Sequence, residues 1–178
     1  MYLRITHKRP GGKAWTLSAS VRPSVTDTNR IERNELLETS MTNETTFKTN
    51  QLFKSVTYDT VADSWYFVFE GKTSTNISAF WRLLVNKEIW EVSLDHGHIF
   101  GLPKPVDLVE RMTEHLTGKN LLEIKIKQDT GDLLLTLTDN YQIEVFISST
   151  GYETYNFTFD NENYIGMGGG EIAIMDIK

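Results

Sequence analysis

The chain has 178 residues, of which 39% are hydrophobic and 11% aromatic, so it holds enough apolar material for one folded domain or two small related halves. It has no cysteine, which excludes disulfide bonds, thiolate metal sites and cysteine nucleophiles. Its formal net charge is −6; residues 1–40 carry seven basic and four acidic side chains, so residues 41–178 carry −9. This acidic body disfavours nucleic acids and anionic membranes as partners, and it is compatible with a basic partner protein.

No apolar run reaches the roughly 18 to 20 residues that a membrane-spanning helix needs. The polar, basic start also differs from a signal peptide, which has a continuous apolar centre. We therefore expect a cytoplasmic protein that does not bind membranes. No motif in the chain indicates a cofactor.

The first 49 residues are predicted to form an N-terminal arm. A turn at residues 9–12, which contains one proline and two glycines, favours a weak hairpin between residues 3–5 and 15–17. From residue 21 to 50 the chain is rich in Thr, Asn, Glu and Arg, which indicates a loose linker. The compact domain is expected to cover residues 50–178.

Large aromatic residues become frequent from Phe53 onward and mark the start of the core. Residues 65–69, Trp-Tyr-Phe-Val-Phe, are apolar on both alternating faces. This pattern predicts a central strand that is covered on both sides or lies at an interface.

One helix is predicted from about residue 105 to residue 117. Leu108, Val109, Met112 and Leu116 lie at helical spacing and form a single apolar stripe. Pro105 suits the first turn of a helix, and Gly118 supplies a stop signal.

The clearest alternation of apolar and polar residues follows the helix. It predicts strands at residues 122–127, 133–137, 141–147, 155–159 and 172–174. Short polar turns join most of these segments, as in an antiparallel meander with one solvent-facing side. The fold class is therefore α+β, mainly antiparallel sheet with one helix.

Residues 90–102 align without gaps with residues 155–167, matching aromatic, apolar, hydroxyl, Asp and Gly positions. An internal duplication would explain the match, with similar strand units at about 50–103 and 119–178 flanking the helix. The alternative is that β meanders resemble one another by pattern alone.

The tetrapeptide Asp95-His96-Gly97-His98 is the most suggestive candidate site. Two histidines at i and i+2 lie on one face of a strand and could bind one metal ion with a carboxylate, or act as a general base. The structural alternative, which we favour, is a loop in which His96 and His98 make hydrogen bonds, because few further ligands are available. No Gly-x-Ser-x-Gly motif accompanies them.

Three further features could belong to a binding surface. Gly166-Met167-Gly168-Gly169-Gly170 resembles a phosphate loop but lacks the Lys-Ser/Thr that should follow, so a sharp bend with close backbone approach is favoured. Arg82 stands beside large rings, and Tyr152 and Glu153 lie in a predicted hairpin loop. Arg82 is expected to pair with Glu153 or with Asp95.

Several of these motifs together resemble a group of small uncharacterised bacterial proteins, some of which look like toxin-immunity proteins. The motifs are Phe-Trp-Arg at 80–82, Asp-His-Gly-His-Ile-Phe-Gly-Leu-Pro at 95–103, Thr-Gly-Asp-Leu at 130–133, Ser-Thr-Gly-Tyr-Glu at 149–153 and the glycines at 168–170. The resemblance covers about residues 50–174 and implies a bacterial, cytosolic origin. It supplies no catalytic residues.

Three functions remain open at this point. The first is a non-enzymatic, immunity-type module that blocks a basic partner protein through an acidic, aromatic-containing face. The second is a small-molecule or metal-binding protein that uses the loop at 95–98, and the third is a histidine-based enzyme. A homodimer is also predicted, through the edge strand near 172–174 or through the strand at 65–69.

Overall fold

The computed structural model describes residues 3–5 and 44–177. The rest of the predicted N-terminal hairpin and linker lies outside the described residues. Within these residues, no helix is long and apolar enough to span a membrane. The elements are β1 Leu3–Ile5, β2 Glu44–Asp59, β3 Ser64–Phe69, β4 Ser74–Ile77, β5 Phe80–Val85, β6 Glu88–Val92, α2 Leu108–Leu116, β7 Asn120–Lys127, β8 Leu133–Leu137, β9 Tyr141–Phe146, β10 Tyr155–Phe159, β11 Glu162–Gly166 and β12 Ile172–Asp176.

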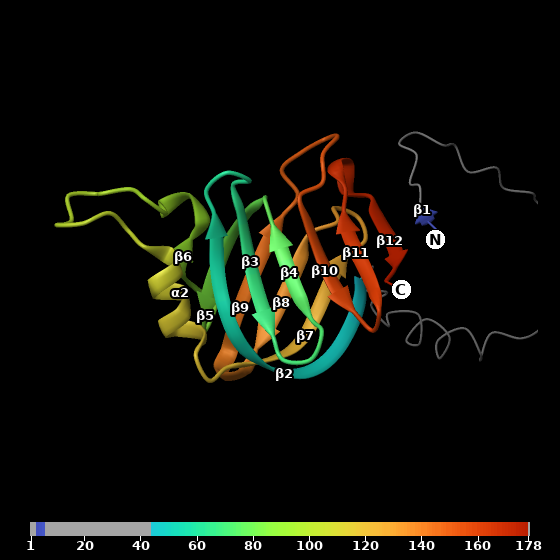
Figure 1. Cartoon of the computed structure of the whole chain (residues 1–178), viewed down its shortest axis with the longest axis horizontal. Helices are drawn as coiled ribbons and strands as arrows, with labels where there is room; N and C mark the ends of the chain where they lie inside the picture. Colours follow the sequence, from blue (N-terminus) through green and yellow to red (C-terminus); the bar gives the residue numbers. More distant parts are fainter. Residues whose placement is uncertain (1–2, 6–43, 178) are drawn as a thin grey trace, which may run out of the picture. The chain divides into compact units, whose positions relative to one another are not determined.

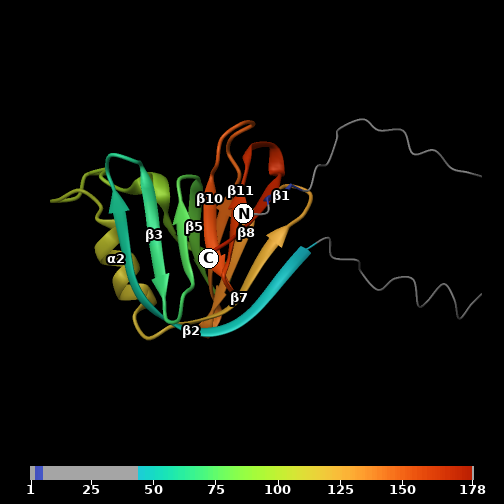
Figure 2. The ribbon, with the colours of Figure 1, turned by 45° about the vertical axis from the view of Figure 1, so that its right-hand side comes forward.

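The twelve described strands form one antiparallel sheet, in the order β1-β12-β11-β10-β4-β3-β2-β7-β8-β9-β5-β6 (Figure 1). The long strand β2 folds this sheet on itself. Its first half pairs with β7 and its second half with β3, and the register shifts between Lys48 and Gln51 and again between Phe53 and Ser55. Because β-bulges bend a strand and increase its twist, β2 can curve around one end of the molecule (Figure 2).

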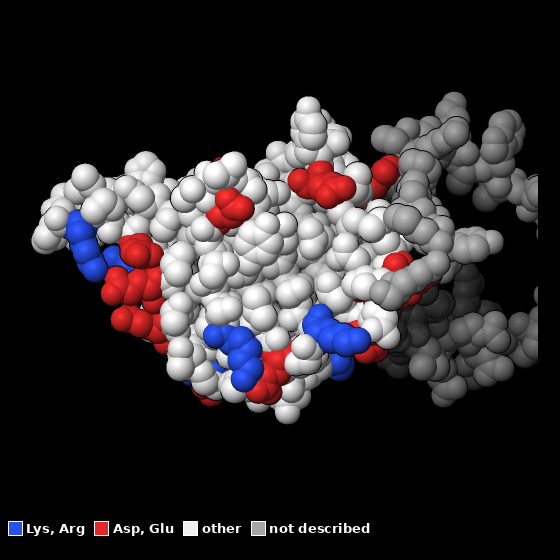
Figure 3. Space-filling model, in the orientation of Figure 1, with Lys and Arg blue, Asp and Glu red and all other residues white. Residues whose placement is uncertain are grey.

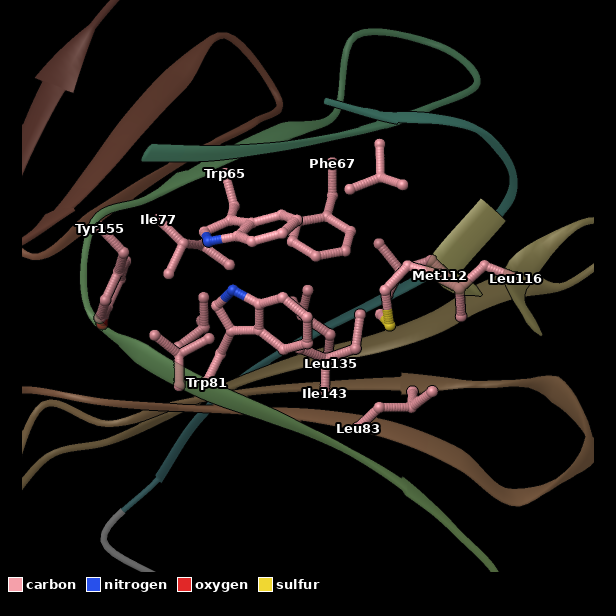
Figure 4. Packing of buried hydrophobic residues seen from close by; sticks show 14 of the residues in the cluster. Trp65, Phe67, Ile77, Trp81, Leu83, Met112, Leu116, Leu135, Ile143 and Tyr155 are labelled. Carbon is pink, nitrogen blue, oxygen red and sulfur yellow. The ribbon is translucent and has the colours of Figure 1, made fainter. Parts of the chain in front are cut away.

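The bend brings two layers face to face, with the core between them. Trp65 of β3 meets Trp81 of β5 edge to face, with ring centroids 5.0 Å apart, and Phe67 meets the same ring at 5.7 Å (Figure 4). Each such ring buries roughly 150–250 Å², worth about 4–6 kcal/mol before conformational entropy is counted. Trp81 Nε1 is buried without a hydrogen-bond acceptor among the described residues. Figure 4 shows this nitrogen on the side of the ring nearest Trp65.

The helix α2 begins three residues later than the sequence predicted. The Asp107 side chain accepts hydrogen bonds from Val109 N and Glu110 N, so it caps a helix that starts at Leu108 and leaves Pro105 in the preceding loop. Of the predicted stripe, Leu108, Met112 and Leu116 are fully buried and Val109 is partly buried. Gly118, at φ +79°, follows the helix end as expected.

The C-terminal strands are confirmed, but they do not form one continuous meander. β7, β8 and β9 are neighbours, and β10, β11 and β12 are neighbours, whereas β9 pairs with β5 and β10 pairs with β4. The alternating pattern specifies the buried side chains of β8, but in β7 Leu122 is 37% exposed while Leu121 and Glu123 are buried, because the register shifts between Leu121 and Glu123. The pattern also does not specify which strand lies alongside. The described chain is thus mostly antiparallel sheet with one helix.

Three other predictions need correction. β12 is not an edge strand, because it pairs with β11 on one side and with β1 on the other. β2 begins at Glu44, before the predicted domain boundary at residue 50. β3 is central as predicted, but only one of its faces is buried, since Val68 is 38% exposed.

The two segments aligned by the proposed duplication have different surroundings. β6 is the last strand of the sheet, whereas β10 lies between β4 and β11. The duplication stays a prediction.

Candidate interaction site

Arg82 does not pair with the carboxylates that the sequence suggested. It lies directly opposite Glu144 of β9, and its Nε donates to the Glu144 carboxylate at 2.6 Å. Its guanidinium also lies over the Phe146 ring, 5.1 Å from the centroid. The cross-strand register therefore decides the partner, and Arg82 belongs to the solvent-facing side of the β5–β9 pair.

His96 is a structural residue that anchors the loop after β6. Its Nδ1 accepts a hydrogen bond from Leu108 N, the first residue of α2, at 3.1 Å. Its ring packs against Tyr58 and Trp65, with centroids 4.8 and 5.0 Å away. The favoured reading of the histidines as hydrogen-bonding loop residues is confirmed for His96.

His98 points elsewhere. Its ring is exposed and stacks on Phe100, with centroids 5.2 Å apart and planes 23° apart. Because Nδ1 of His96 is already engaged, the two histidines do not offer a matched pair of ligands. Among the described residues, no three His, Cys, Asp or Glu side chains gather as a metal site would require.

Residues 96–106, which we call the finger, project from the body between β6 and α2 (Figure 1). Backbone hydrogen bonds close its base: Gly97 N donates to Val106 O, and Val106 N donates to His98 O, each at 2.8 Å. Val106 is buried, so the base is fixed to the core.

The tip of the finger is a tight turn with an unusual residue in it. Leu102 N donates to Ile99 O at 2.7 Å, and the two residues between them, Phe100 and Gly101, have φ +45° and +76°. Positive φ at both central positions is the type I′ arrangement, which Asn and Gly prefer. For a bulky residue such as Phe100 this backbone costs about 1–2 kcal/mol, and strain of this kind collects at functional sites.

Exposed apolar side chains gather in the finger and in the segment just before it. Of the eleven large apolar side chains that are exposed among the described residues, six lie within residues 89–102, and three of these are in the finger. Phe100 is 66% exposed. Exposed apolar side chains that gather in one region often mark an interaction site. We call this set the apolar patch; it consists of Ile89, Trp90, Leu94, Ile99, Phe100 and Leu102.

A buried carboxylate clasps α2 to β6 next to the finger. Glu91 is 7% exposed; its Oε2 accepts from Arg111 Nη1 and its Oε1 contacts His115 Nε2, both at 3.3 Å. A bulge in the β5–β6 pair, between Leu83 and Leu84, leaves Trp90 unpaired, and the Trp90 ring packs against His115 at 5.2 Å. These contacts join β6, which precedes the finger, to α2, which follows it.

Acidic side chains lie beside the finger. Asp107, Glu110 and Glu114 are exposed on or next to α2, and Figure 3 shows Asp and Glu gathered over this helix. Residues 86–116 contain six acidic and three basic side chains, for a net charge of −3. The apolar patch therefore has an acidic rim, although Lys104, paired with Glu110 at 3.0 Å, adds one cation.

Tyr152 and Glu153 lie in a different place, the loop between β9 and β10, which Figure 1 shows away from the finger. Tyr152 is 81% exposed. Asp95 ends a short 3₁₀ turn at the base of the finger, and its backbone carbonyl accepts from His98 N. The predicted site residues therefore divide among the finger, the outer side of β5 and the β9–β10 loop.

The glycine run is a bend with close backbone approach, as the sequence favoured. Gly169 and Gly170 have φ +78° and +86°. A Cβ on Gly168 would lie 2.1 Å from Gly151 N, and one on Gly170 would lie 2.9 Å from Thr130 O. These glycines pack against neighbouring loops and offer no room for a phosphate.

A comparison with protein-family models, curated proteins and solved structures found no significant match to this chain.

Proposed function

We propose that this chain is a non-enzymatic protein-binding module that holds its partner by inserting the tip of the finger into an apolar pocket with a basic rim. The observation that carries the proposal is that Ile99, Phe100 and Leu102 of the apolar patch are displayed on a strained turn, in a loop whose base is fixed by hydrogen bonds. Aromatic anchors that enter a pocket are the usual centres of protein interfaces. Phe100 is the anchor.

The rigidity of the finger supports this role. Its base is tied to α2 through His96, and α2 is clasped to β6 through Glu91. A preformed loop loses little conformational entropy on binding, so more of the contact energy becomes affinity.

The charge around the finger favours a protein over a membrane. Asp107, Glu110 and Glu114 would meet the anionic headgroups of a lipid surface with repulsion, whereas a basic rim on a protein would attract them. An immunity-type role, in which a basic partner is blocked, agrees with this charge and with the family resemblance of the motifs.

The test compares two variants in a pulldown from lysate of the source cells. Phe100→Asn removes the ring and relieves the backbone strain, because Asn tolerates positive φ. Val61→Ser is the matched control, since Val61 is 96% exposed in the β2–β3 turn, outside the apolar patch. We expect a defined partner to be recovered with the wild type and with Val61→Ser, and to be reduced about tenfold or more with Phe100→Asn.

Equal recovery with Phe100→Asn would refute the proposal. With the partner purified, Glu114→Lys tests the rim. We expect it to slow association several-fold and to change dissociation little, because exposed rim charges act mainly on the association rate.

A further inference from the structure

The outer face of the β2–β3–β4–β10 layer has no charged residue in its centre. Alternation along each strand sets this face: Val56, Phe67, Ile77 and Phe157 are buried in the core, so their neighbours point outward. Figure 3 shows the same face, with acidic and basic side chains only toward its margins. We call this surface the uncharged face; it consists of Thr57, Tyr66, Val68, Ser74, Asn76 and Asn156.

Four of these residues form one straight row across four strands. Thr57 lies opposite Tyr66, Tyr66 opposite Asn76, and Asn76 opposite Asn156. At a strand spacing of about 4.8 Å the row spans about 14 Å, the length of a short oligosaccharide.

The polar groups of this row are unused within the protein. None of the hydroxyl and amide groups of Thr57, Tyr66, Asn76 and Asn156 makes a side-chain hydrogen bond to another described residue, and the buried Oδ1 of Asn76 lacks a partner. The Tyr66 ring likewise stacks on no other described aromatic ring. Apart from the buried Asn76 Oδ1, the row therefore offers its hydrogen-bonding groups and one aromatic surface to an external ligand.

The outer face of the other layer shows that a solvent-exposed face of this sheet can carry many charged side chains. There Arg82 pairs with Glu144, and Glu123 pairs with Lys48 and Lys125. Burial alone would raise the pKa of Glu123, but hydrogen bonds from the two lysines lower it. That face thus carries several ion pairs, whereas the uncharged face has an ion pair only at its margin, between Lys54 and Glu70 at 2.6 Å, among the described residues.

We infer that the uncharged face is a binding site for a neutral glycan. Sugar hydroxyls both donate and accept hydrogen bonds, which suits amide and hydroxyl side chains, and the C–H side of a sugar ring packs on an aromatic face such as that of Tyr66. Nucleic acids and acidic polysaccharides need cations that this face lacks. A protein partner needs larger apolar anchors, and Val68 is the only large apolar side chain of this face that is substantially exposed.

The experiment is a titration of the ¹⁵N-labelled full chain with neutral hexasaccharides of glucose and of N-acetylglucosamine, each to millimolar excess. An acidic hexasaccharide that contains uronic acid is the negative control. We expect at least one neutral sugar to shift the side-chain amide signals of Asn76 and Asn156, while the acidic sugar shifts neither.

Three variants locate the site. Tyr66→Ala should weaken binding about tenfold through loss of the aromatic surface, and Asn156→Ala should weaken it without disturbing the strand interior. Gln142→Ala, which removes an amide from the outer side of β9, should leave binding unchanged. The inference is overturned if no neutral sugar shifts these amides, or if Tyr66→Ala and Asn156→Ala bind like the wild type. These results do not depend on the finger or on its partner.

Discussion

Tyr155→Phe should destabilise the protein through a single buried hydrogen bond. Tyr155 is 2% exposed, and its hydroxyl donates to the carbonyl of the buried Gly131 at 2.7 Å, at the end of the turn between β7 and β8. The substitution removes the donor, keeps the ring and leaves the carbonyl without a partner. The expected loss in the free energy of unfolding is about 1–2 kcal/mol, which lowers Tm by roughly 3–8 °C.

The matched control is Tyr66→Phe. The Tyr66 hydroxyl lies on the outer face and makes no hydrogen bond to another described residue. This variant should stay within about 0.5 kcal/mol of the wild type. Denaturant unfolding measures both, and the m-value should be unchanged. Equal stability of the two variants would refute the assignment of the hydrogen bond.

Tyr155→Phe should also change how the stability of the protein depends on pH in the alkaline range. Burial, followed by the charge of Asp132, raises the pKa of Tyr155 above its ordinary value of 10.0, and burial with the Glu162 hydrogen bond raises the pKa of Tyr164. In the unfolded chain both phenols lose their protons near pH 10, whereas in the folded protein they keep them. Stability is therefore full below pH 10 and falls as the pH rises above it, by about 1.4 kcal/mol per pH unit for each proton. Tyr155→Phe should make this fall shallower, and an unchanged slope would contradict the argument.

The other predictions concern local backbone features. Phe100→Asn should raise the free energy of unfolding by about 0.5–1 kcal/mol in denaturant titrations, because Asn adopts positive φ at lower cost; a loss of stability would contradict the strained turn. Gly168→Ala should cost about 2–4 kcal/mol, since its Cβ would lie 2.1 Å from Gly151 N, whereas Gly151→Ala meets no atom within 4 Å and should be nearly neutral. Asp107→Ala should lower Tm by an amount equivalent to about 1 kcal/mol through loss of the helix cap, and an unchanged Tm would argue against that cap.

The sequence predicted the interior well where one face of a strand is buried throughout. Leu133, Leu135 and Leu137 alternate with polar or half-buried residues, and the structure buries all three. A period of two is sufficient here because β8 stays in one layer with the same side inward. The end of α2 before Gly118 could also be predicted from the sequence, because a glycine in the left-handed conformation ends a helix wherever the helix lies.

β2 escaped prediction for a physical reason. Phe47 and Phe53 point into the core at odd positions, but Val56 does so at an even position, because the bulge between Phe53 and Ser55 changes which side of the strand faces inward. A search for strict alternation loses the pattern at such a point. The polar residues at the start of the strand then look like a linker.

The candidate site was located in part. The sequence drew attention to residues 95–98 through the histidines, whose chemistry is recognisable without a structure. The residues that matter in the proposal are Ile99, Phe100 and Leu102, directly after them. Apolar residues are expected inside a protein, so only the structure could show that these three are exposed. The sequence could not predict the ion-pair partner of Arg82 either, because that partner follows from the pairing of β5 with β9.

The position of the finger explains why a strained turn can persist there. The chain must leave the edge strand β6 and return to α2, and both ends of that path are fixed, by the Glu91 clasp and by the His96 hydrogen bond to Leu108. Strain at Phe100 therefore stays at the tip, where relaxing it would not loosen the core. Under the proposed function, the Phe100 ring contributes more in the complex than its backbone costs in the free protein. Stability and binding should consequently respond to Phe100→Asn in opposite directions, a result that a merely tolerated turn residue would not produce.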